Sequence, residues 1–422
     1  MPALPEKCAH EMKLFTLNRY NHSRQPAGSG PWQTETIGGD LAKMPDERPH
    51  IGIFVSFSGV GGVERMMVNL AAGLSALGCR VDLIPVKRTS AFLDQLPSAV
   101  RLVDLGCRHT RAALPGLVRY LRRERPAALL SAKDRANQIA ILARRFAAGP
   151  TRLVVRMGTT VSAFVGSTRP LKLRLKVFPI RRLYPQADAV VAVSRGVAQD
   201  LEQVVGLPPA LLRVIPNPVI TPELFRQATG PAPHPWFQDR SRPVLVSMGR
   251  LTRQKDFPTL IRAFALVRAE RPCRLLILGG GQDRGALLDL ARQLGVGADL
   301  ELPGFTANPY GYLKHAACFV LSSIWEGSPN ALTEALALGT PAVATDCPSG
   351  PAEILTGPLR PFLVPMLAVE PMAAAIRLAL TAPPAAADLQ FAVRRYTQDL
   401  SSRNYLQVLL LDFGHFQEKL EN

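Results

Sequence analysis

A short apolar run, a turn rich in glycine or proline and a helical pattern follow one another repeatedly along the sequence. The clearest case begins at Ala317 to Ser322, which reads as a buried strand, and continues at Pro329 to Leu338, which reads as a helix. Ser328 is the expected N-cap of that helix, with Pro329 as its first residue. Strands that alternate with helices favour a parallel sheet with helices on both faces. The sequence therefore predicts an α/β protein.

The length predicts two domains. A chain of 422 residues is too long for one ordinary core, and domains of about 200 residues are the usual solution. The Pro-rich run from Thr229 to Pro243 reads as a linker, which places the boundary near residue 240. The predicted parts are a flexible N-terminal extension (1–48), a first domain with its linker (49–240), a second domain (241–390) and C-terminal helices (391–422).

Within the first domain the same pattern recurs. Glycines 59, 61 and 62 follow the first strand and allow the backbone to approach a ligand closely, although such turns also serve simple connection. The expected strands lie near 51–56, 81–86, 127–130, 152–156 and 187–194, and the expected helices near 66–77, 112–124, 134–147 and 169–184.

Two carboxylates surround the helix start at Pro329. The first amides of a helix have no partner within it, so this end of a parallel sheet suits a phosphate. Glu326 lies in the preceding loop and Glu334 eight positions later in the helix, so both can face a ligand that extends from that phosphate. A carboxylate accepts two hydroxyls at once, which suits a sugar. The alternative is a solvated loop residue and an exposed helix residue.

The run from Glu326 to Glu334 (Glu-x7-Glu) resembles the signature of the retaining, metal-independent GT-B glycosyltransferases of family four, a group of bacterial cell-envelope and polysaccharide enzymes. The following ALALGTPAVATD and CPSGPAEIL are similar to that family as well, and the resemblance covers about residues 51–410. It implies two Rossmann-like, doubly wound parallel-sheet domains that face a cleft, with the last helices crossing back onto the first domain.

The resemblance also implies the roles of the site residues. Glu326 would contact the donor sugar, Glu334 would hold the ribose hydroxyls, and Arg250 with Lys255, five apart in one loop, would clamp the departing diphosphate. Alone, such basic loop residues are most often solvated. The further donor-binding candidates are Gly61, Gly62, Gly327, Ser328, Pro329, Asn330, Ala331 and Phe305.

One segment departs from the family. Many relatives carry a histidine in a run like R-x-H-N, whereas the matching run here is Arg156-Met157-Gly158-Thr159-Thr160. Either the backbone and Thr159 take the place of the imidazole, or the sugar site differs. Arg156 faces the cleft in one interpretation and forms a structural salt bridge in the other.

The formal charge of +17 is concentrated in one part of the chain. Between Arg101 and Arg182 there are 19 Lys or Arg residues against three acidic residues, a local net charge of +16. The run from Arg169 to Tyr184 fits a helix with Leu171, Leu175 and Phe178 in one stripe, and Lys172, Arg174 and Lys176 around it. Such a surface suits an anionic membrane, with an ordinary packed helix as the alternative. Nucleic acid would explain the charge but not the two sugar-site motifs, so we expect none.

These observations predict a metal-independent transferase without a resident cofactor, because no D-x-D and no cysteine–histidine cluster at ligand spacing occurs. The GGGQDRG turn does not match the dinucleotide fingerprint. We expect a hexose-type sugar to move from a UDP- or GDP-sugar to a glycan or lipid-linked acceptor, in the cytoplasm or on the inner face of the membrane. The alternative is a non-catalytic nucleotide-sugar-binding protein.

Overall fold

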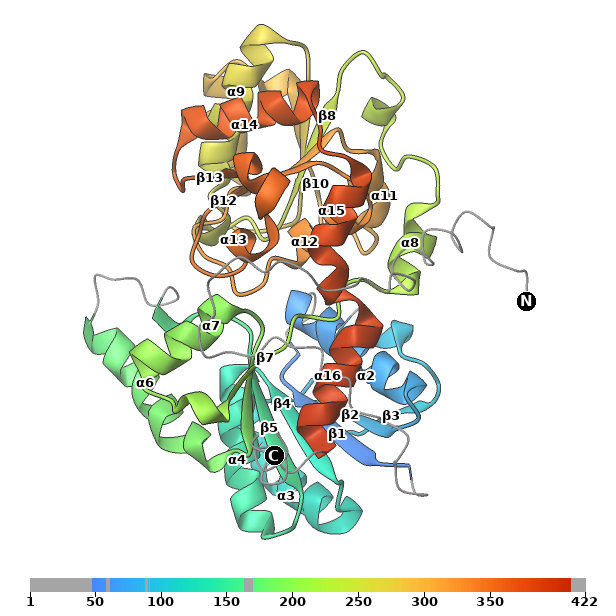
Figure 1. The fold of residues 1–422 in the computed structure, drawn as a ribbon, viewed down its shortest axis with the longest axis vertical. Helices are drawn as coiled ribbons and strands as arrows, with labels where there is room; N and C mark the ends of the chain where they lie inside the picture. Colours follow the sequence, from blue (N-terminus) through green and yellow to red (C-terminus); the bar gives the residue numbers. More distant parts are fainter. Residues whose placement is uncertain (1–47, 58–60, 88–89, 91, 163–169, 411–422) are drawn as a thin grey trace, which may run out of the picture. The chain divides into compact units, whose positions relative to one another are not determined.

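The structure is a computed structural model that describes residues 48–57, 61–87, 90, 92–162 and 170–410. The described residues form two units (Figure 1). The N-terminal unit holds the described residues up to Pro218 together with Gln398–Leu410, and the C-terminal unit is Val219–Thr397. The predicted extension (except Arg48), Gly59 and residues 411–422 lie outside the described residues.

The N-terminal unit is built on a seven-stranded parallel sheet with the order β3-β2-β1-β4-β5-β6-β7. The order reverses between β1 and β4, which is where such sheets bind ligands at their carboxyl edge. The strands are β1 (His50–Val55), β2 (Arg80–Pro85), β3 (Val100–Leu102), β4 (Ala128–Ala132), β5 (Arg152–Met157), β6 (Ala189–Ala192) and β7 (Leu212–Val214).

Helices cover both faces of this sheet. Residues of α3 and α4 share an apolar core with one face, while α16 packs on α2 and against β4 and β5 (Figure 1). α2 begins four residues before the expected Met66, because Gly61 already takes the extended backbone of an N-cap. The helices are α2 (Gly62–Ala76), α3 (Ala113–Glu124), α4 (Asp134–Ala147), α6 (Pro170–Leu183), α7 (Arg195–Asp200) and α16 (Gln398–Leu410).

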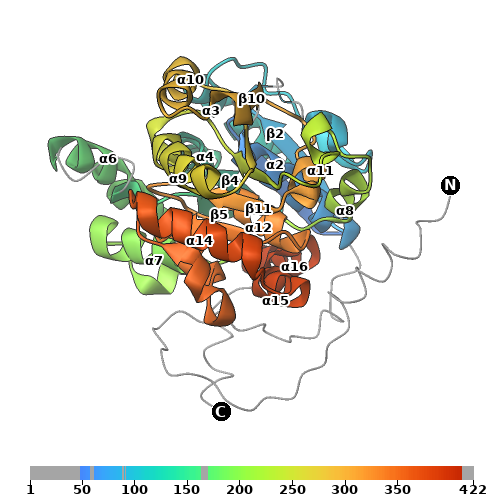
Figure 2. The same cartoon turned by 90° about the horizontal axis from the view of Figure 1, so that it is seen from above.

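The C-terminal unit repeats the design with a six-stranded parallel sheet in the order β10-β9-β8-β11-β12-β13. In the view of Figure 2 its helices are seen from above, where α9 packs on α14, and α12 packs on α11 and α15. The strands are β8 (Val244–Met248), β9 (Arg274–Leu278), β10 (Leu300–Gly304), β11 (Cys318–Leu321), β12 (Ala342–Thr345) and β13 (Leu363–Val364). The helices are α8 (Pro222–Ala228), α9 (Phe257–Glu270), α10 (Arg284–Gln293), α11 (Tyr310–His315), α12 (Asn330–Ala337), α13 (Pro351–Ile354), α14 (Val369–Thr381) and α15 (Ala386–Val393).

The Pro-rich run from Thr229 to Pro243 belongs to the C-terminal unit. Trp236 lies under the guanidinium of Arg274, 5.2 Å from its Cζ, and Phe237 meets Tyr312 edge-on with ring centroids 6.2 Å apart. These aromatic contacts hold the run on the C-terminal sheet and helices. The chain therefore passes between the units at Pro218 and Val219, about twenty residues before the predicted boundary near 240.

The predicted fold of two doubly wound parallel sheets is confirmed. The expected strands and helices of the N-terminal unit are present within a few residues of their predicted bounds, and β3 and β7 are strands that were not predicted. In the part of the chain that the structure describes, none of the helices has the length and apolar character needed to span a bilayer.

Candidate functional site

An ion pair lies at the centre of the predicted sugar-nucleotide site. Lys255 Nζ approaches Glu326 Oε1 to 2.5 Å, and Ser323 Oγ donates to the same oxygen at 2.6 Å. Glu326 is only 7% exposed. A carboxylate in such a place needs a cation and hydrogen-bond donors. The sequence predicted Lys255 and Glu326 in the same site, and the structure shows in addition that their side chains form a direct ion pair.

Gly249 allows the lysine to reach this position. A Cβ at Gly249 would stand 2.8 Å from Lys255 Cε, so the lysine stem lies against the bare backbone at the end of β8. Ser322 Oγ donates to the carbonyl of Lys255 at 2.6 Å and fixes the main chain on the other side. The lysine is therefore held by packing before any substrate arrives.

Ser349 and Gly350 support the loop that follows Glu326. Ser349 Oγ donates to the carbonyl of Gly327 at 2.8 Å. Gly350 has φ +101°, and a Cβ there would lie 2.5 Å from Pro329 Cδ, so only glycine fits. The CPSG run, residues 347–350, thus packs against the loop that follows Glu326 and supports it.

Helix α12 begins differently from the prediction. Its N-cap is Pro329 rather than Ser328, and its first residue is Asn330. The Ser328 side chain makes no capping bond, because its Oγ is buried and, among the described residues, has no hydrogen-bond partner. The predicted N-cap is therefore wrong, whereas Asn330 and Ala331 do open the helix. Such first-turn positions suit a phosphate.

Glu334 is fully buried on α12. Together with the burial of Glu326, this makes the alternative of two solvated carboxylates wrong. An ionised carboxylate in this setting costs free energy unless a charge or hydrogen bonds offset it. Neither acidic residue is therefore a surface charge.

Arg250 and Phe305 lie in exposed loops of the C-terminal unit. Arg250 follows β8, and its guanidinium has no hydrogen bond or ion pair with another described residue. Phe305 is 51% exposed directly after β10. Both side chains are available to a ligand at the carboxyl edge of the sheet.

The GGGQDRG turn has a packing role. A Cβ at Gly279 would lie 2.0 Å from the carbonyl oxygen of Gly249, and one at Gly281 would lie 2.3 Å from that of Leu251. The glycines therefore let this turn lie directly on the backbone of the Arg250 loop.

Gly61 and Gly62 lie in the N-terminal unit, where they start α2. Sequence reasoning missed their neighbour Lys133, which follows β4 with φ +77° and ψ +134°, a conformation that few residues other than glycine adopt. Lys133 Nζ donates to the carbonyl of Ser56 at 2.6 Å and pairs with the buried Glu64 at 3.1 Å. A lysine directly after a buried apolar strand was the available signal. Lys133 thus links the carboxyl ends of β1 and β4, between which the strand order reverses.

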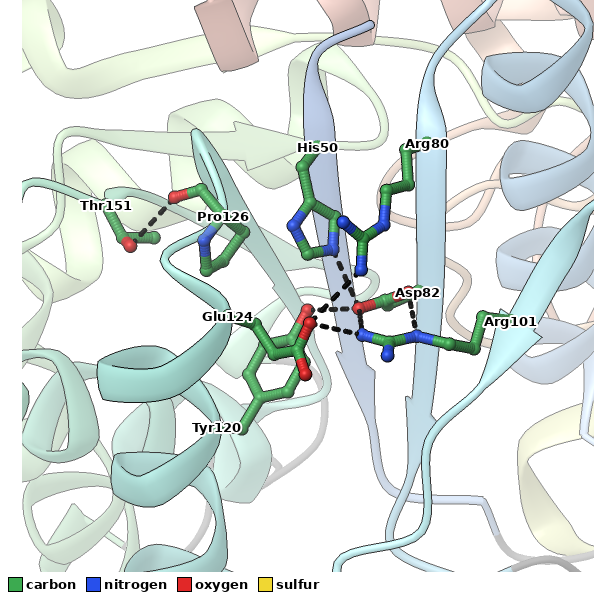
Figure 3. A network of polar contacts seen from close by, with 8 residues as sticks. All are labelled: His50, Arg80, Asp82, Arg101, Tyr120, Glu124, Pro126 and Thr151. Carbon is green, nitrogen blue, oxygen red and sulfur yellow. Dashed lines mark hydrogen bonds and ion pairs between the residues drawn. The ribbon is translucent and has the colours of Figure 1, made fainter.

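A separate polar cluster lies at the other end of this sheet, where β1 and β2 begin (Figure 3). His50, Asp82 and Glu124 are close enough to hold a metal ion. However, Asp82 already accepts two hydrogen bonds from Arg101, at 2.8 and 2.5 Å, and one from Tyr120 at 2.8 Å. With a guanidinium in place, the cluster is a structural brace and does not fit a cation site.

Two family models match the chain. "Glycosyltransferase Family 4" matches residues 60–222 and "Glycosyl transferases group 1" matches residues 234–396. The N-acetylgalactosamine-N,N'-diacetylbacillosaminyl-diphospho-undecaprenol 4-alpha-N-acetylgalactosaminyltransferase of Campylobacter jejuni is 30% identical over 72% of this chain and 82% of its own length. An uncharacterized glycosyltransferase of Methanocaldococcus jannaschii is 45% identical over 26% of this chain, and the match spans only 28% of that protein.

Solved structures share the fold. Anabaena HepE in complex with UDP-glucose superimposes with a TM-score of 0.69 at 19% identity, over 85% of this chain and 99% of that one. At this identity the likeness concerns the fold alone.

Proposed function

Because the chain belongs to glycosyltransferase family 4 and has the GT-B fold, we propose that it transfers a hexose-type sugar from a UDP- or GDP-sugar to a glycan or lipid-linked acceptor of a cell-envelope polysaccharide or lipopolysaccharide. The proposed reaction retains the anomeric configuration, uses no metal and needs no resident cofactor. The observation that carries the proposal is the contact between Lys255 and Glu326 in front of helix α12.

In this proposal, different residues of the C-terminal unit bind different parts of the donor. Lys255 and Arg250 stabilise the negative charge on the leaving diphosphate, and the backbone amides between Gly327 and Ala331, except that of Pro329, add hydrogen bonds. Glu326 accepts hydroxyls of the sugar. Glu334 binds the ribose, and Phe305 lies against the base. Gly61 and Gly62 of the N-terminal unit contact the donor diphosphate or the acceptor.

In the reaction, the bond between the anomeric carbon and the diphosphate oxygen breaks, and a bond to the acceptor oxygen forms on the same face of the sugar. The acceptor proton goes to the departing phosphate oxygen, so atoms and charge balance without a further reagent. Fixed cations suit this step because charge develops on the leaving group.

Release of nucleoside diphosphate tests the proposal. The full chain is incubated with UDP- and GDP-linked sugars, with and without lipid-linked acceptors, and the configuration of the product is read by NMR from its anomeric proton. We expect acceptor-dependent release from at least one donor, with an α-linked product from an α-linked donor. Binding without release would instead support the non-catalytic nucleotide-sugar-binding protein.

We further propose that the N-terminal unit attaches to an anionic membrane through α6, on the cytoplasmic face. Leu175 and Phe178 are 69% and 70% exposed, and Arg174 and the pair Arg181–Arg182 are exposed beside them. Val177 and Ile180 pack into the core, so the helix keeps a second apolar face for another partner. Lys176 is less available, since it pairs with Asp134 at 3.2 Å. The side chains of Leu171 and Lys172 lie outside the described part.

Vesicle sedimentation tests this attachment. Leu175→Glu with Phe178→Glu should weaken binding to phosphatidylglycerol vesicles at least about tenfold, since burial of each apolar side chain is worth about 1.5–3 kcal/mol and the new carboxylates are repelled by the anionic surface. Leu294→Glu, at a 39% exposed leucine of the C-terminal unit, is the matched control and should bind normally. Equal binding of all three proteins would contradict a role for α6.

A further inference from the structure

The N-terminal unit contains a buried cation that the proposed reaction does not use. Arg156, near the end of β5, is 1% exposed. Its Nη2 donates to Asn217 Oδ1 at 2.5 Å. Its Nε and Nη1 are buried and have no hydrogen-bond partner among the described residues. A guanidinium with two unused donors is thus enclosed in the core.

The neighbours of Arg156 do not neutralise it. Asn217 carries no charge, and burial raises the pKa of the Tyr405 hydroxyl on α16, so that this neighbour is neutral too, although the Arg156 charge opposes the shift. No carboxylate of the described chain pairs with Arg156. An unpaired charge in a core is costly, and folded proteins normally pair it. The structural salt bridge that the sequence left open is therefore not formed within the described residues, and none of these residues supplies an anionic partner.

Gly158 leaves space beside the guanidinium. A Cβ at this position would lie 3.1 Å from Arg156 Nη1, and its three nearest atoms would all belong to that guanidinium. The φ angle of Gly158 is not in the left-handed region, so the turn itself does not require glycine. Gly158 is half-buried, whereas Arg156 is covered. The absence of a side chain at Gly158 therefore leaves the position next to Nη1 vacant.

The segment after Gly158 is fixed in place. Asp200 of α7 accepts hydrogen bonds from the amides of Val161 and Ser162. Thr160 is 3% exposed, and its Oγ1 lacks a hydrogen-bond partner among the described residues. A loop that is held in this way and carries unused donors has the character of a prepared binding site.

We propose that Arg156 and Gly158 form an oxyanion-binding site in the N-terminal unit, in which the guanidinium takes a phosphate or carboxylate oxygen of a substrate through the space beside Gly158. Only the identification of the ligand as a transferase substrate rests on the proposed function. The bound oxyanion is then a phosphate of a lipid-linked acceptor or the carboxylate of an acidic sugar.

Anion titrations of the full chain test the site. The probes are inorganic phosphate and glucuronate, and the readouts are the thermal unfolding midpoint and calorimetric affinity. All variants are made in an Arg250→Ala background, which removes the exposed cation of the C-terminal site. Arg156→Met removes the charge, and Gly158→Ala retains the charge but fills the space. Gly149→Ala is the matched control, since a Cβ there meets nothing within 4 Å.

We expect Arg156→Met and Gly158→Ala to weaken anion binding about tenfold to a hundredfold, as for the loss of a hydrogen bond to a charged group. Gly149→Ala should bind like the background. Without anion, Arg156→Met should unfold at the same or a higher temperature, because an unpaired buried charge is gone. A response to phosphate alone would identify an acceptor phosphate, and a response to glucuronate alone an acidic sugar.

Unchanged anion binding in both variants would overturn the proposal, as would a large fall in the unfolding temperature of Arg156→Met with anion binding intact. If the protein releases no nucleoside diphosphate from any donor but retains this anion response, the proposed function fails and the oxyanion site remains.

Discussion

Lys255 and Glu326 depend on one another, because each is the charge partner of the other in a place that water barely reaches. Lys255→Met keeps the apolar stem over Gly249 and removes the ammonium. We expect turnover to fall about a hundredfold to a thousandfold, the usual loss when a stabilising group of the transition state is removed. Steady-state release of nucleoside diphosphate measures this. Lys314→Met, at an exposed lysine of the same unit, should stay near wild type, and a similar loss in both variants would point to general damage.

Asp82 is the residue on which the brace at the amino end of the N-terminal sheet depends. Burial alone raises the pKa of this carboxyl, but hydrogen bonds from Arg101, His50 and Tyr120 outweigh it and hold the pKa well below its ordinary value. A carboxyl whose pKa is depressed by folding stabilises the protein above its unfolded pKa of about 4, and this stabilisation is lost as the pH falls.

Asp82→Asn should therefore lower the free energy of unfolding by about 2–4 kcal/mol at pH 7, because Arg101 and His50 lose the negative charge of their acceptor. Urea unfolding at several pH values measures this. The difference between the two proteins should shrink progressively below about pH 4, because the unfolded carboxyl takes up its proton there while the folded one does so only at lower pH. A difference that is independent of pH down to pH 2 would exclude the charge of Asp82 as the cause.

Single residues also show where sequence reasoning ends. Glu326, Glu334 and Lys255 could be assigned to one site from their motifs, but the pairing of Lys255 with Glu326 joins residues 71 positions apart. Ser328 is a residue type that is common at N-caps, yet Pro329 is the N-cap of α12 in a loop that packs on Ser349 and Gly350. Tertiary packing decided both cases, and local patterns do not contain it.

At the scale of elements, the contact between α2 and α16 joins segments from opposite ends of the chain. A Cβ at Gly73 of α2 would lie 2.1 Å from Ser402 Oγ and 3.0 Å from its Cβ. In an isolated helix, Gly→Ala is worth about 1 kcal/mol of added stability. Here we expect Gly73→Ala to destabilise by about 1–3 kcal/mol, since overpacking outweighs the gain in helix propensity. Urea unfolding of the full chain gives the number.

The double variant Gly73→Ala with Ser402→Ala separates the two causes. Removal of the hydroxyl takes away the closer contact, so a part of the lost stability should return. If Gly73→Ala alone stabilises the protein, the two helices are not packed as closely as the structure shows.

Strands were easier to predict than their surroundings. Strands that are buried on both faces of a parallel sheet, such as β1 and β4, read as continuous apolar runs. β3 was missed because it has only three residues, with the exposed Arg101 at its centre. Helix α6 was found from its stripe, but only the structure shows that Leu175 and Phe178 face away from the core.

At the scale of the whole molecule, the sequence predicted two doubly wound units because strand and helix patterns alternate through both halves. It misplaced the passage between them, since proline-rich composition suggested a linker while Trp236 and Phe237 within that run provide apolar packing. The charge excess over residues 101–182 falls in the N-terminal unit, which is also where the proposed membrane and oxyanion contacts lie.

In the proposed reaction, fixed cations of the C-terminal unit stabilise the departing nucleoside diphosphate, and Glu334 holds its ribose. The most direct test compares acceptor-dependent diphosphate release by the wild type, Arg250→Ala, Glu334→Gln and Arg253→Ala, all shown to be folded by circular dichroism. Arg253 is an exposed arginine of the same loop and serves as the control. We predict that Arg250→Ala and Glu334→Gln lose at least about a hundredfold in turnover while Arg253→Ala keeps it. Near-normal release by Arg250→Ala or Glu334→Gln, or an equal loss in Arg253→Ala, would contradict the account.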